Sequence, residues 1–410
     1  MFRVTACLIA WLVAAPAWAF LPGQPVGMLN PQVQPANASA GLPAVDDKLG
    51  AGGYPIAGGV CAEWGHQVPC NNHYSTTRSS PKYVSASDGL YASVPANVFS
   101  LGSNTGGLIE EVRTNDALWS RDMTNAAWVK TTMTTALNAV GIDGTANSAT
   151  TLTASGALAM AVQTITLASQ GDNYSVFLKR VTGSGTVSIC LGVTACVSPV
   201  ACTVTSTTTF TRCTTTATVL NPIVGVQIST NGDSVIADFN QMEPGGFATS
   251  PMLTTSAATT RQADAVTATG ALFALANSPQ ASLMLVTGIL SQSNSVLMDR
   301  DHNTNVIAQE LTATSFRQLA NNVAITSTLG SGNFTTGPVK SATTWSAALG
   351  GSAVSNNGTL VTNASAFSGT ATSPTVGSYG AATLFIDGPM TGVVGFLPKI
   401  PDVTAKALTQ

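Results

Sequence analysis

Asp299 and Asp301 stand two positions apart, the spacing at which one strand presents two carboxylates on the same face. Hydrolysis of a glycosidic bond uses such a pair, because one carboxyl group protonates the leaving oxygen while the other attacks the sugar or activates water. Arg300 separates the two aspartates, and His302 and Asn303 follow them directly. Because Asp and Asn are typical turn residues, a solvated hairpin turn is the favoured interpretation and a catalytic pair is the alternative.

Other catalytic patterns are missing from the sequence. The chain has three histidines, His66, His73 and His302, and it has no Gly-x-Ser-x-Gly motif to present a serine nucleophile. No glycine-rich phosphate loop stands between a strand and a helix. We therefore predict a protein that is not an enzyme and that uses no cofactor.

Trp119, Trp128, Asn115 and Asp122 are the residues best suited to binding a sugar. An aromatic face packs on the apolar side of a pyranose ring, while amide and carboxylate groups bond its hydroxyls. The four residues lie close together in the chain. Tryptophan is also highly buried on average, so a core position for one or both indoles is the favoured alternative.

Six of the seven cysteines follow the first twenty residues, and their short separations favour local disulfides. None of them has the Cys-x-x-Cys or His-x-x-x-His spacing of a tetrahedral zinc site, so we predict no metal site. A calcium ion held by Asp299, Asp301 or Asp233 at the rim of a sandwich is the alternative. In a reducing compartment all six would instead be small buried hydrophobic residues. The predicted pairs are Cys61 with Cys70, Cys190 with Cys196, and Cys202 with Cys213.

Short β-strands must position these residues. Charged residues make up only 9% of the chain, and Thr, Ser, Ala, Gly and Val dominate it. Thr and Val fit a pleated, half-buried surface, and the frequent Gly and Asn residues punctuate short strands. Residues 174–180 (YSVFLKR) alternate in the way that sends successive side chains to opposite sheet faces. Similar strand patterns occur at residues 149–153, 162–167, 186–189, 210–216 and 223–229.

Residues 107–128, which begin GLIEEVRTN, resemble the opening strands of a lectin-like β-sandwich found in phage tail and other virion surface proteins. Residues 238–251 (DFNQMEPGGFATSP), together with residues 260–264, resemble the closing strands of the same module. The resemblance implies a jelly roll of about eight strands. It also implies a surface-exposed adhesion or structural protein rather than a metabolic enzyme.

Three glutamates match strand positions of that module. They are Glu110, Glu111 and Glu243, and we expect them to fix strand ends rather than to transfer protons. Residues 74–90 resemble the segment that leads into the module, although Pro81 and Lys82 depart from its pattern.

A second resemblance covers residues 264–410. Their strand patterns, an Asn-Gly turn at residues 355–359 and the tail at residues 386–409 are similar in order to the concanavalin-type sandwich of laminin-G-like domains. The predicted fold is therefore all-β, with two tandem β-sandwiches after an irregular N-terminal segment. We expect the jelly roll at residues 76–253 and the concanavalin-like domain at residues 264–410.

Residues 1–19 have the features of a secretory signal peptide. Arg3 precedes an apolar run at residues 6–15, and Ala17-Trp18-Ala19 forms a small-x-small cleavage site before Phe20. The alternative is a short buried strand or helix. The run is shorter than the about 20 residues that span a bilayer, so we expect no membrane segment in the mature chain. Residues 20–75 are rich in Pro and Gly and are predicted to be a linker or attachment segment.

These features predict a phage or prophage virion structural protein, in a tail, fibre or surface decoration, that binds host-surface glycan. The alternative is a secreted bacterial carbohydrate-binding or adhesion protein, which the signal peptide would explain directly. Expected partners are host-surface polysaccharide, other virion proteins and further copies of the chain, since fibres of such modules are commonly homotrimeric. With only 16 Lys and Arg and a net charge of -3, no basic stripe is present, so nucleic acid is excluded as a partner.

Overall fold

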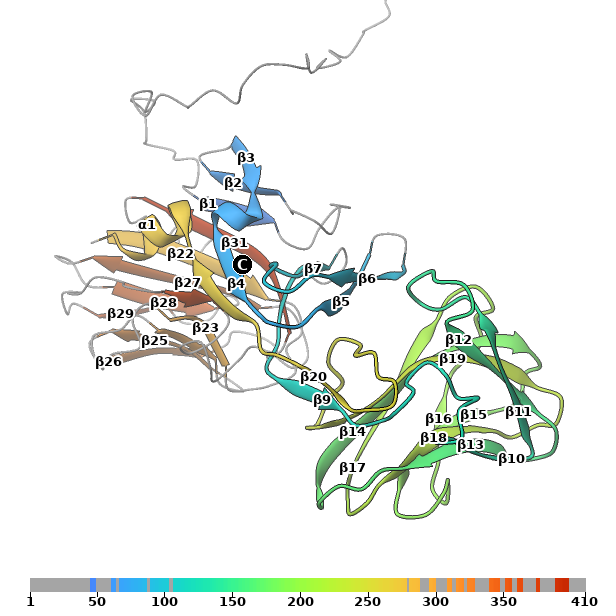
Figure 1. The fold of residues 1–410 in the computed structure, drawn as a ribbon. Coiled ribbons are helices and arrows are strands. Elements are labelled where there is room, and N and C mark those ends of the chain that lie inside the picture. The colour runs from blue at the N-terminus through green and yellow to red at the C-terminus, as the bar shows by residue number, and fades with distance from the viewer. Residues whose placement is uncertain are drawn as a thin grey trace, which may run out of the picture. The chain divides into compact units, whose positions relative to one another are not determined.

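A computed structural model describes most of the chain between residues 45 and 397. The described residues are mainly β-strands, and their one α-helix, α1 (Gly270–Ala276), has seven residues. The predicted all-β class with two β-sandwiches is confirmed (Figure 1). The predicted signal peptide at residues 1–19 and its cleavage site lie outside the described residues. These comprise residues 45–48, 60–63, 66–86, 89–102, 106–278, 280–287, 295–299, 308–311, 315–320, 323–328, 339–346, 351–355, 360–363, 374–376 and 388–397.

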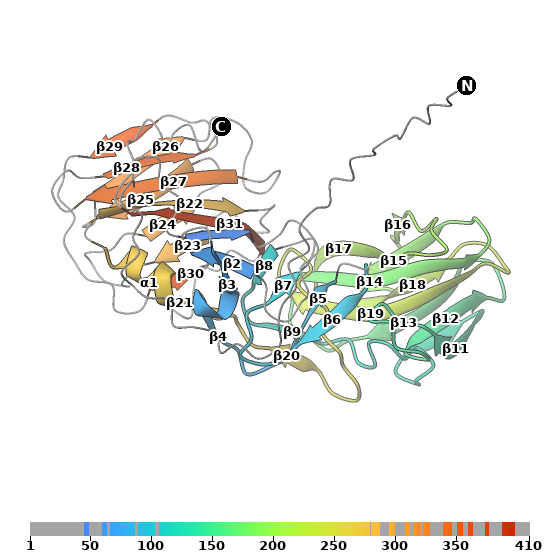
Figure 2. The ribbon, with the colours of Figure 1, turned by 90° about the horizontal axis from the view of Figure 1, so that it is seen from above.

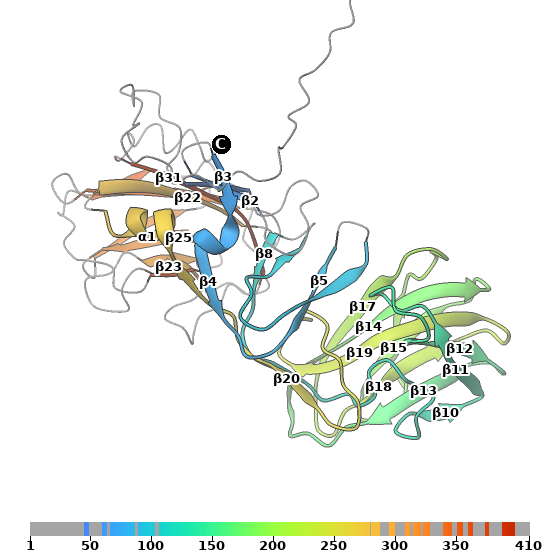
Figure 3. The same ribbon diagram turned by 45° about the horizontal axis from the view of Figure 1, so that its top comes forward.

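Two five-stranded antiparallel sheets form the jelly-roll sandwich. We name each after its central strand, and strands of both are seen in Figure 3. The β18 sheet has the order β10 (Val129–Thr131), β13 (Ala159–Thr164), β18 (Ile223–Ile228), β15 (Val187–Gly192) and β16 (Val200–Cys202). The β19 sheet has the order β11 (Met133–Ala139), β12 (Ala149–Ala154), β19 (Ser234–Pro244), β14 (Gln170–Thr182) and β17 (Thr211–Val219).

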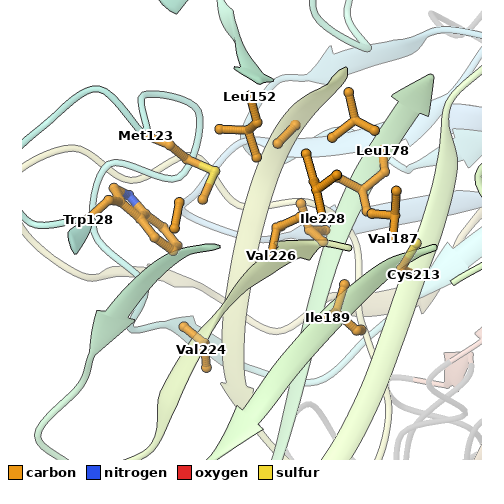
Figure 4. Close-up of a cluster of buried hydrophobic side chains, with 14 of the residues drawn as sticks. Met123, Trp128, Leu152, Leu178, Val187, Ile189, Cys213, Val224, Val226 and Ile228 are labelled. Carbon is orange, nitrogen blue, oxygen red and sulfur yellow. The ribbon is translucent and has the colours of Figure 1, made fainter. Parts of the chain in front are cut away.

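The two sheets share one hydrophobic core. Val224, Val226 and Ile228 of β18 are buried in the same cluster as Leu178 of β14 (Figure 4). Val176 of β14 belongs to this cluster too. These positions alternate along each strand, so the residues between them point to the opposite, outward face of each sheet. The alternation in residues 174–180 is thus the core pattern of the jelly roll.

The second sandwich combines strands from both ends of the described chain (Figure 2). Its eight-stranded sheet has the order β29 (Val361–Asn363), β28 (Gly351–Ser355), β27 (Val339–Ser346), β22 (Gln280–Thr287), β31 (Gly388–Phe396), β8 (Gly106–Ile109) and β7 (Leu101–Gly102), and β1 (Val45–Lys48) also pairs with β31. Its seven-stranded sheet has the order β26 (Val323–Thr328), β25 (Ser315–Ala320), β24 (Ala308–Leu311), β23 (Ser295–Asp299), β30 (Thr375–Val376), β21 (Ala265–Ala268) and β4 (Tyr74–Thr77).

Strand pairing here differs from the predicted division of the chain. β1 lies in the predicted linker and β8 in the predicted jelly-roll segment, yet both pair with β31. β4, at the predicted boundary, pairs with β21. Residues 45–109 therefore supply strands to the sheets that residues 265–396 build. Pairing over such a separation depends on the register of distant strands, which no local pattern reports.

The remaining described strands form three two-stranded antiparallel ribbons. They are β2 (Val60–Glu63) with β3 (His66–Pro69), β5 (Lys82–Ser85) with β6 (Tyr91–Val94), and β9 (Arg113–Asn115) with β20 (Thr259–Arg261). The β9–β20 ribbon contains the residues that lead into the jelly roll and the residues that leave it, so it joins the two ends of that module.

The structure contains the three disulfides that the spacing predicts. Cys61 and Cys70 have their Cα atoms 4.9 Å apart, Cys190 and Cys196 5.0 Å, and Cys202 and Cys213 5.9 Å. The first two close short loops. The third joins β16, an edge strand of the β18 sheet, to β17, an edge strand of the β19 sheet.

Replacing both Cys202 and Cys213 by serine is expected to lower the free energy of unfolding by about 2 kcal/mol, since the closed loop is short. Urea denaturation of the purified chain measures the change. The Cys190→Ser/Cys196→Ser variant is the matched control, because it removes a bridge between β15 and the loop that follows it and leaves the two sheets linked. An unchanged urea midpoint for the first variant would contradict a stabilising link between the sheets.

Candidate functional site

Trp128 lies in the jelly-roll core. Its side chain is 1% exposed and belongs to the same buried cluster as Met123 and Leu152 (Figure 4). The indole Nε1 donates to the carbonyl oxygens of Leu118 and Trp119 at 3.2 and 3.3 Å. The structure therefore gives Trp128 the core position and leaves no face of the ring for a sugar.

Asn115 has a structural role. It is fully buried, and its amide nitrogen donates to the carbonyls of Asn240 and Met252, both at 3.0 Å. Its side-chain oxygen accepts from the backbone nitrogens of Ala117 and Met242 at 3.1 and 2.9 Å. All the bonds that a carboxamide normally makes are in use. Asn115 thus fastens β9 to β19 and offers no group to a ligand.

Trp119 and Asp122 are half-buried. The Trp119 ring packs against the jelly-roll core, and its backbone nitrogen donates to the carbonyl of Thr255 at 2.8 Å. The Asp122 carboxylate accepts from the backbone nitrogen and the hydroxyl of Thr124, a typical turn contact. The four predicted ligand residues therefore stabilise the segment that opens the jelly roll, and they do not form a common binding surface.

Glu110 fixes the end of β8. Its two carboxylate oxygens accept from the backbone nitrogen and the hydroxyl of Ser250 at 2.8 and 2.7 Å, and Lys82 lies 2.9 Å away. Burial alone would raise the pKa of Glu110, but Arg261, Lys82 and the Ser250 hydroxyl together hold this pKa well below its usual value. A carboxylate held ionised in this way is a structural anchor and not a proton donor.

The lowered pKa of Glu110 predicts how stability depends on pH. A carboxyl group with a depressed pKa in the folded state stabilises the fold fully above its unfolded pKa of about 4.5, and this contribution is lost as pH falls further. We expect Glu110→Gln to be less stable than the natural chain at neutral pH. The difference in the free energy of unfolding between the two proteins, measured by chemical denaturation, should become smaller below about pH 4.5. A difference that stays constant down to strongly acidic pH would contradict this prediction, and Glu111→Gln controls for losing one neighbouring negative charge.

The remaining predicted carboxylates do not form a catalytic pair among the described residues. Glu243 is buried and accepts from the backbone nitrogen and hydroxyl of Thr249 at 2.8 and 2.6 Å. Glu111 pairs with Arg113. Asp299 is the last residue of β23, and Asp301 lies outside the described residues.

Charged and aromatic side chains occupy the outward face of the β19 sheet. Arg121 donates to both oxygens of Asp143 at 2.7 Å and to both oxygens of Asp238 at 2.8 and 3.1 Å. Its guanidinium lies 4.6 Å from the centre of the Phe239 ring. Burial alone would raise the pKa of Asp143, but the bonds from Arg121 and the Thr145 backbone hold this pKa below its usual value.

The β5–β6 hairpin covers part of this face. The Tyr83 ring meets Phe239 edge to face at 5.0 Å, and the Tyr91 ring meets Phe177 in the same way at 5.2 Å. Phe177 and Phe239 are 3% and 1% exposed as a result. Aromatic packing of this kind stabilises the hairpin on the sheet and leaves these two rings unavailable to a ligand.

The outward face of the β18 sheet is different. Gln227 of β18 is paired with Met160 of β13 on one side and with Ser188 of β15 on the other. Directly paired residues of antiparallel strands point to the same face, so these three side chains form one row that faces away from the core. Thr131 of β10, paired with Met160, extends the row at the edge of the sheet and is exposed.

An apolar row lies beside the polar row. Gly225 is paired with Val162 and with Cys190, whose disulfide to Cys196 lies at this side of the sheet. Val129 is paired with Val162 and is 62% exposed. We call the two rows together the Gln227 face, which comprises Thr131, Met160, Gln227, Ser188, Val129, Val162, Gly225 and Cys190.

Gln227 differs from the other buried amides of the jelly roll. The side chains of Gln163, Asn173 and Gln241 all have hydrogen-bond partners, as Asn115 and Asn240 have. Gln227, at 9% exposed, has no side-chain hydrogen bond within the described chain, and neither has Ser188 at 7%. A recessed carboxamide and hydroxyl that stand side by side without partners can bond an incoming ligand.

The chemistry of the Gln227 face suits a neutral, hydroxyl-rich ligand. A carboxamide both donates and accepts, a hydroxyl does the same, and the valines beside them contact apolar C–H groups. Sequence reasoning did not single out Gln227 or Ser188. The available signal was the segment 223–228 (IVGVQI), in which Gly225 and Gln227 interrupt an otherwise apolar strand.

No helix within the described ranges is long and apolar enough to cross a membrane. Nor do three or more His, Cys, Asp or Glu side chains gather around a possible metal ion anywhere in that part of the chain.

No family of known proteins matches this chain, and no curated protein matches it. Among solved structures, the chain is similar to the CBM40 of the Ruminococcus gnavus IT-sialidase bound to α2,3 sialyllactose, with a TM-score of 0.29 and 12% identity over 34% of this chain and 88% of that one. It is also similar to the CBM22-1–CBM22-2 tandem domain of Paenibacillus barcinonensis Xyn10C, with a TM-score of 0.26 and 6% identity over 70% of this chain and 97% of that one. Likeness at this level carries no argument about function.

Proposed function

We propose that this chain is a glycan-binding surface protein without catalytic activity, and that the Gln227 face of the jelly roll binds the sugar. The observation that carries the proposal is the unpartnered pair Gln227 and Ser188 in a module whose other buried amides are all bonded. Such a pair supplies donors and acceptors for sugar hydroxyls, and the neighbouring valines supply apolar contact.

The biological setting that we propose is the surface of a phage or prophage virion. The resemblance of residues 107–128 and 238–264 to a virion surface module supports this setting, in which other virion proteins and two further copies of the chain are the partners. A secreted bacterial adhesion protein is the alternative, because the sequence of residues 1–19 favours export. Phage structural genes beside the coding gene would support the first setting and their absence the second.

The absence of catalysis is part of the proposal. It is supported by the structural bonding of Glu110 and Glu243, which leaves these buried carboxylates committed to Ser250 and Thr249. Incubated with a bound polysaccharide, the chain should leave the polymer length unchanged by size-exclusion chromatography. Depolymerisation that is lost on Asp299→Asn or Asp301→Asn would overturn this part of the proposal.

Replacing Gln227 by alanine is expected to weaken glycan binding about tenfold, because two hydrogen bonds worth about 0.5 to 1.5 kcal/mol each are lost. For Ser188→Ala, the loss of binding free energy should be about half of that for Gln227→Ala, since a single hydroxyl is removed. A glycan array screens the purified chain for a ligand, and isothermal titration calorimetry with that ligand measures the affinities.

Asn138→Ala is the matched control. Asn138 is an exposed amide on β11, in the other sheet, and bonds only the Thr151 hydroxyl among described residues. This variant should bind as the natural chain does. If Gln227→Ala and the natural chain bind glycan with equal affinity while both are folded, the Gln227 face is not the binding site.

A further inference from the structure

A network of buried ion pairs joins three cations to only two carboxylates. Asp264 lies 2.5 Å from Arg78 and 2.6 Å from Lys82, and Glu110 lies 2.9 Å from Lys82 and 3.6 Å from Arg261. The five side chains are between 0% and 5% exposed. Three cations therefore face two carboxylates. A buried charge without a contacting counter-charge is strongly unfavourable. The other buried carboxylate nearby, Glu243, bonds Thr249 and forms no ion pair with these three cations among the described residues, so the network can accept one more negative group.

The uncompensated charge lies at Arg261. This side chain is 1% exposed, and its Nε, Nη1 and Nη2 atoms have no hydrogen-bond partner among the described residues. Glu110 is too far for a hydrogen bond, and both of its oxygens already accept from Ser250. Burying guanidinium donors without partners costs more than burying a neutral polar group.

A second guanidinium stands directly opposite. Arg261 of β20 is paired with Arg113 of β9, so both side chains point to the same face of the ribbon. Arg113 donates to the Pro244 carbonyl, pairs with Glu111 and stacks with its guanidinium 4.7 Å from the centre of the Phe247 ring. Its Nε has no partner in the part of the chain that the structure describes. Two like charges in directly opposed positions repel each other unless an anion is shared between them.

We propose that Arg261, with Arg113 beside it, binds a small monovalent anion of the chloride type. One such ion supplies a negative charge and accepts hydrogen bonds from the free donors of Arg261. A water molecule would accept the same hydrogen bonds but would not neutralise the guanidinium charge. Arg261 is too deeply buried to receive a polymer, so the ligand is a free ion and not an acidic glycan.

Thermal unfolding of the full chain tests this proposal. Chloride is varied at constant ionic strength by exchange with gluconate, a much larger monovalent anion, so that general screening stays the same. A ligand that binds only the folded state raises the melting temperature in a saturable manner, and we expect a rise of about 2 to 4 °C. Arg261→Gln should lose this chloride-specific rise. Arg212→Gln, an arginine outside the network that bonds Ser175, should retain it.

Bromide soaked into crystals of the natural chain gives a second, independent readout. An anomalous peak beside Arg261 is expected, and this measurement decides the matter if Arg261→Gln does not fold. Equal melting temperatures in chloride and gluconate, a chloride response that survives Arg261→Gln, or bromide sites only elsewhere would each overturn the proposal.

Discussion

Asp264→Ala is expected to lower the free energy of unfolding by about 3 to 5 kcal/mol, the cost of breaking a buried ion pair by removing one partner. The Asp264 carboxylate is 1% exposed and accepts from Arg78 at 2.5 Å, from Lys82 at 2.6 Å and from the Glu110 backbone nitrogen at 3.0 Å. Alanine would leave Arg78 without its carboxylate partner, and Lys82 would share Glu110 with Arg261. Guanidinium denaturation with linear extrapolation measures the loss.

Asp122→Ala is the control for this variant, because Asp122 is a half-buried aspartate whose carboxylate bonds only Thr124 among described residues. Its expected cost is about 1 kcal/mol or less. If Asp264→Ala were no more destabilising than the control, the ion-pair network would not hold the segments around residues 78, 110 and 264 together.

Trp128→Ala is also expected to cost about 3 to 5 kcal/mol, since truncating a large core side chain removes its burial and leaves a cavity. Two hydrogen bonds from the indole to Leu118 and Trp119 are lost at the same time. Trp128→Phe keeps most of the volume and should recover part of the stability. The same denaturation experiment measures both variants.

The Trp119→Ala variant separates the core role from a sugar-binding role. Trp119 is half-buried at the edge of the same core, so its removal should cost less than that of Trp128. Glycan affinity should be unchanged in Trp119→Ala if the Gln227 face is the site. Lost affinity with an intact fold would return the site to the residues that the sequence favoured.

Local patterns account for the parts of the fold that were predicted correctly. The alternation of Tyr174, Val176 and Leu178 reports which side of a strand faces the core, and that side is the one buried in the jelly roll. The cysteine pairs are equally local, because each closes a loop short enough for the chain to bring both residues together. Two sandwiches of short strands therefore followed from composition, strand patterns and the resemblance of their terminal segments.

The positions of individual side chains were less accessible to prediction. Tryptophan and asparagine suit both a sugar site and a core, and only the surrounding carbonyls show that Trp128 and Asn115 serve the fold. Gln227 stands out only after the register places it beside Ser188 and shows that the other buried amides are bonded. Neither its position beside Ser188 nor the bonding of the other amides can be predicted from the residues adjacent to Gln227 in the sequence.

Long-range pairing was the other feature beyond local patterns. β8 was expected to open the jelly roll, because residues 107–115 resemble that module's first strand. In the structure, β8 pairs with β31, whereas β9 pairs with β20. Asn115 at the end of β9 is bonded to β19. Antiparallel partners so far apart in sequence are selected by burial and register in the assembled sandwich.

A crystal structure of the chain with its tightest-binding oligosaccharide tests the central claim most directly. We expect the sugar on the outward face of the β18 sheet, with a hydroxyl at hydrogen-bond distance, about 2.7 to 3.2 Å, from the Gln227 carboxamide. Contact with Ser188 and Val162 should accompany it. A sugar bound at Trp119 or elsewhere on the chain, or a chain that binds no glycan on a broad array, would contradict the account.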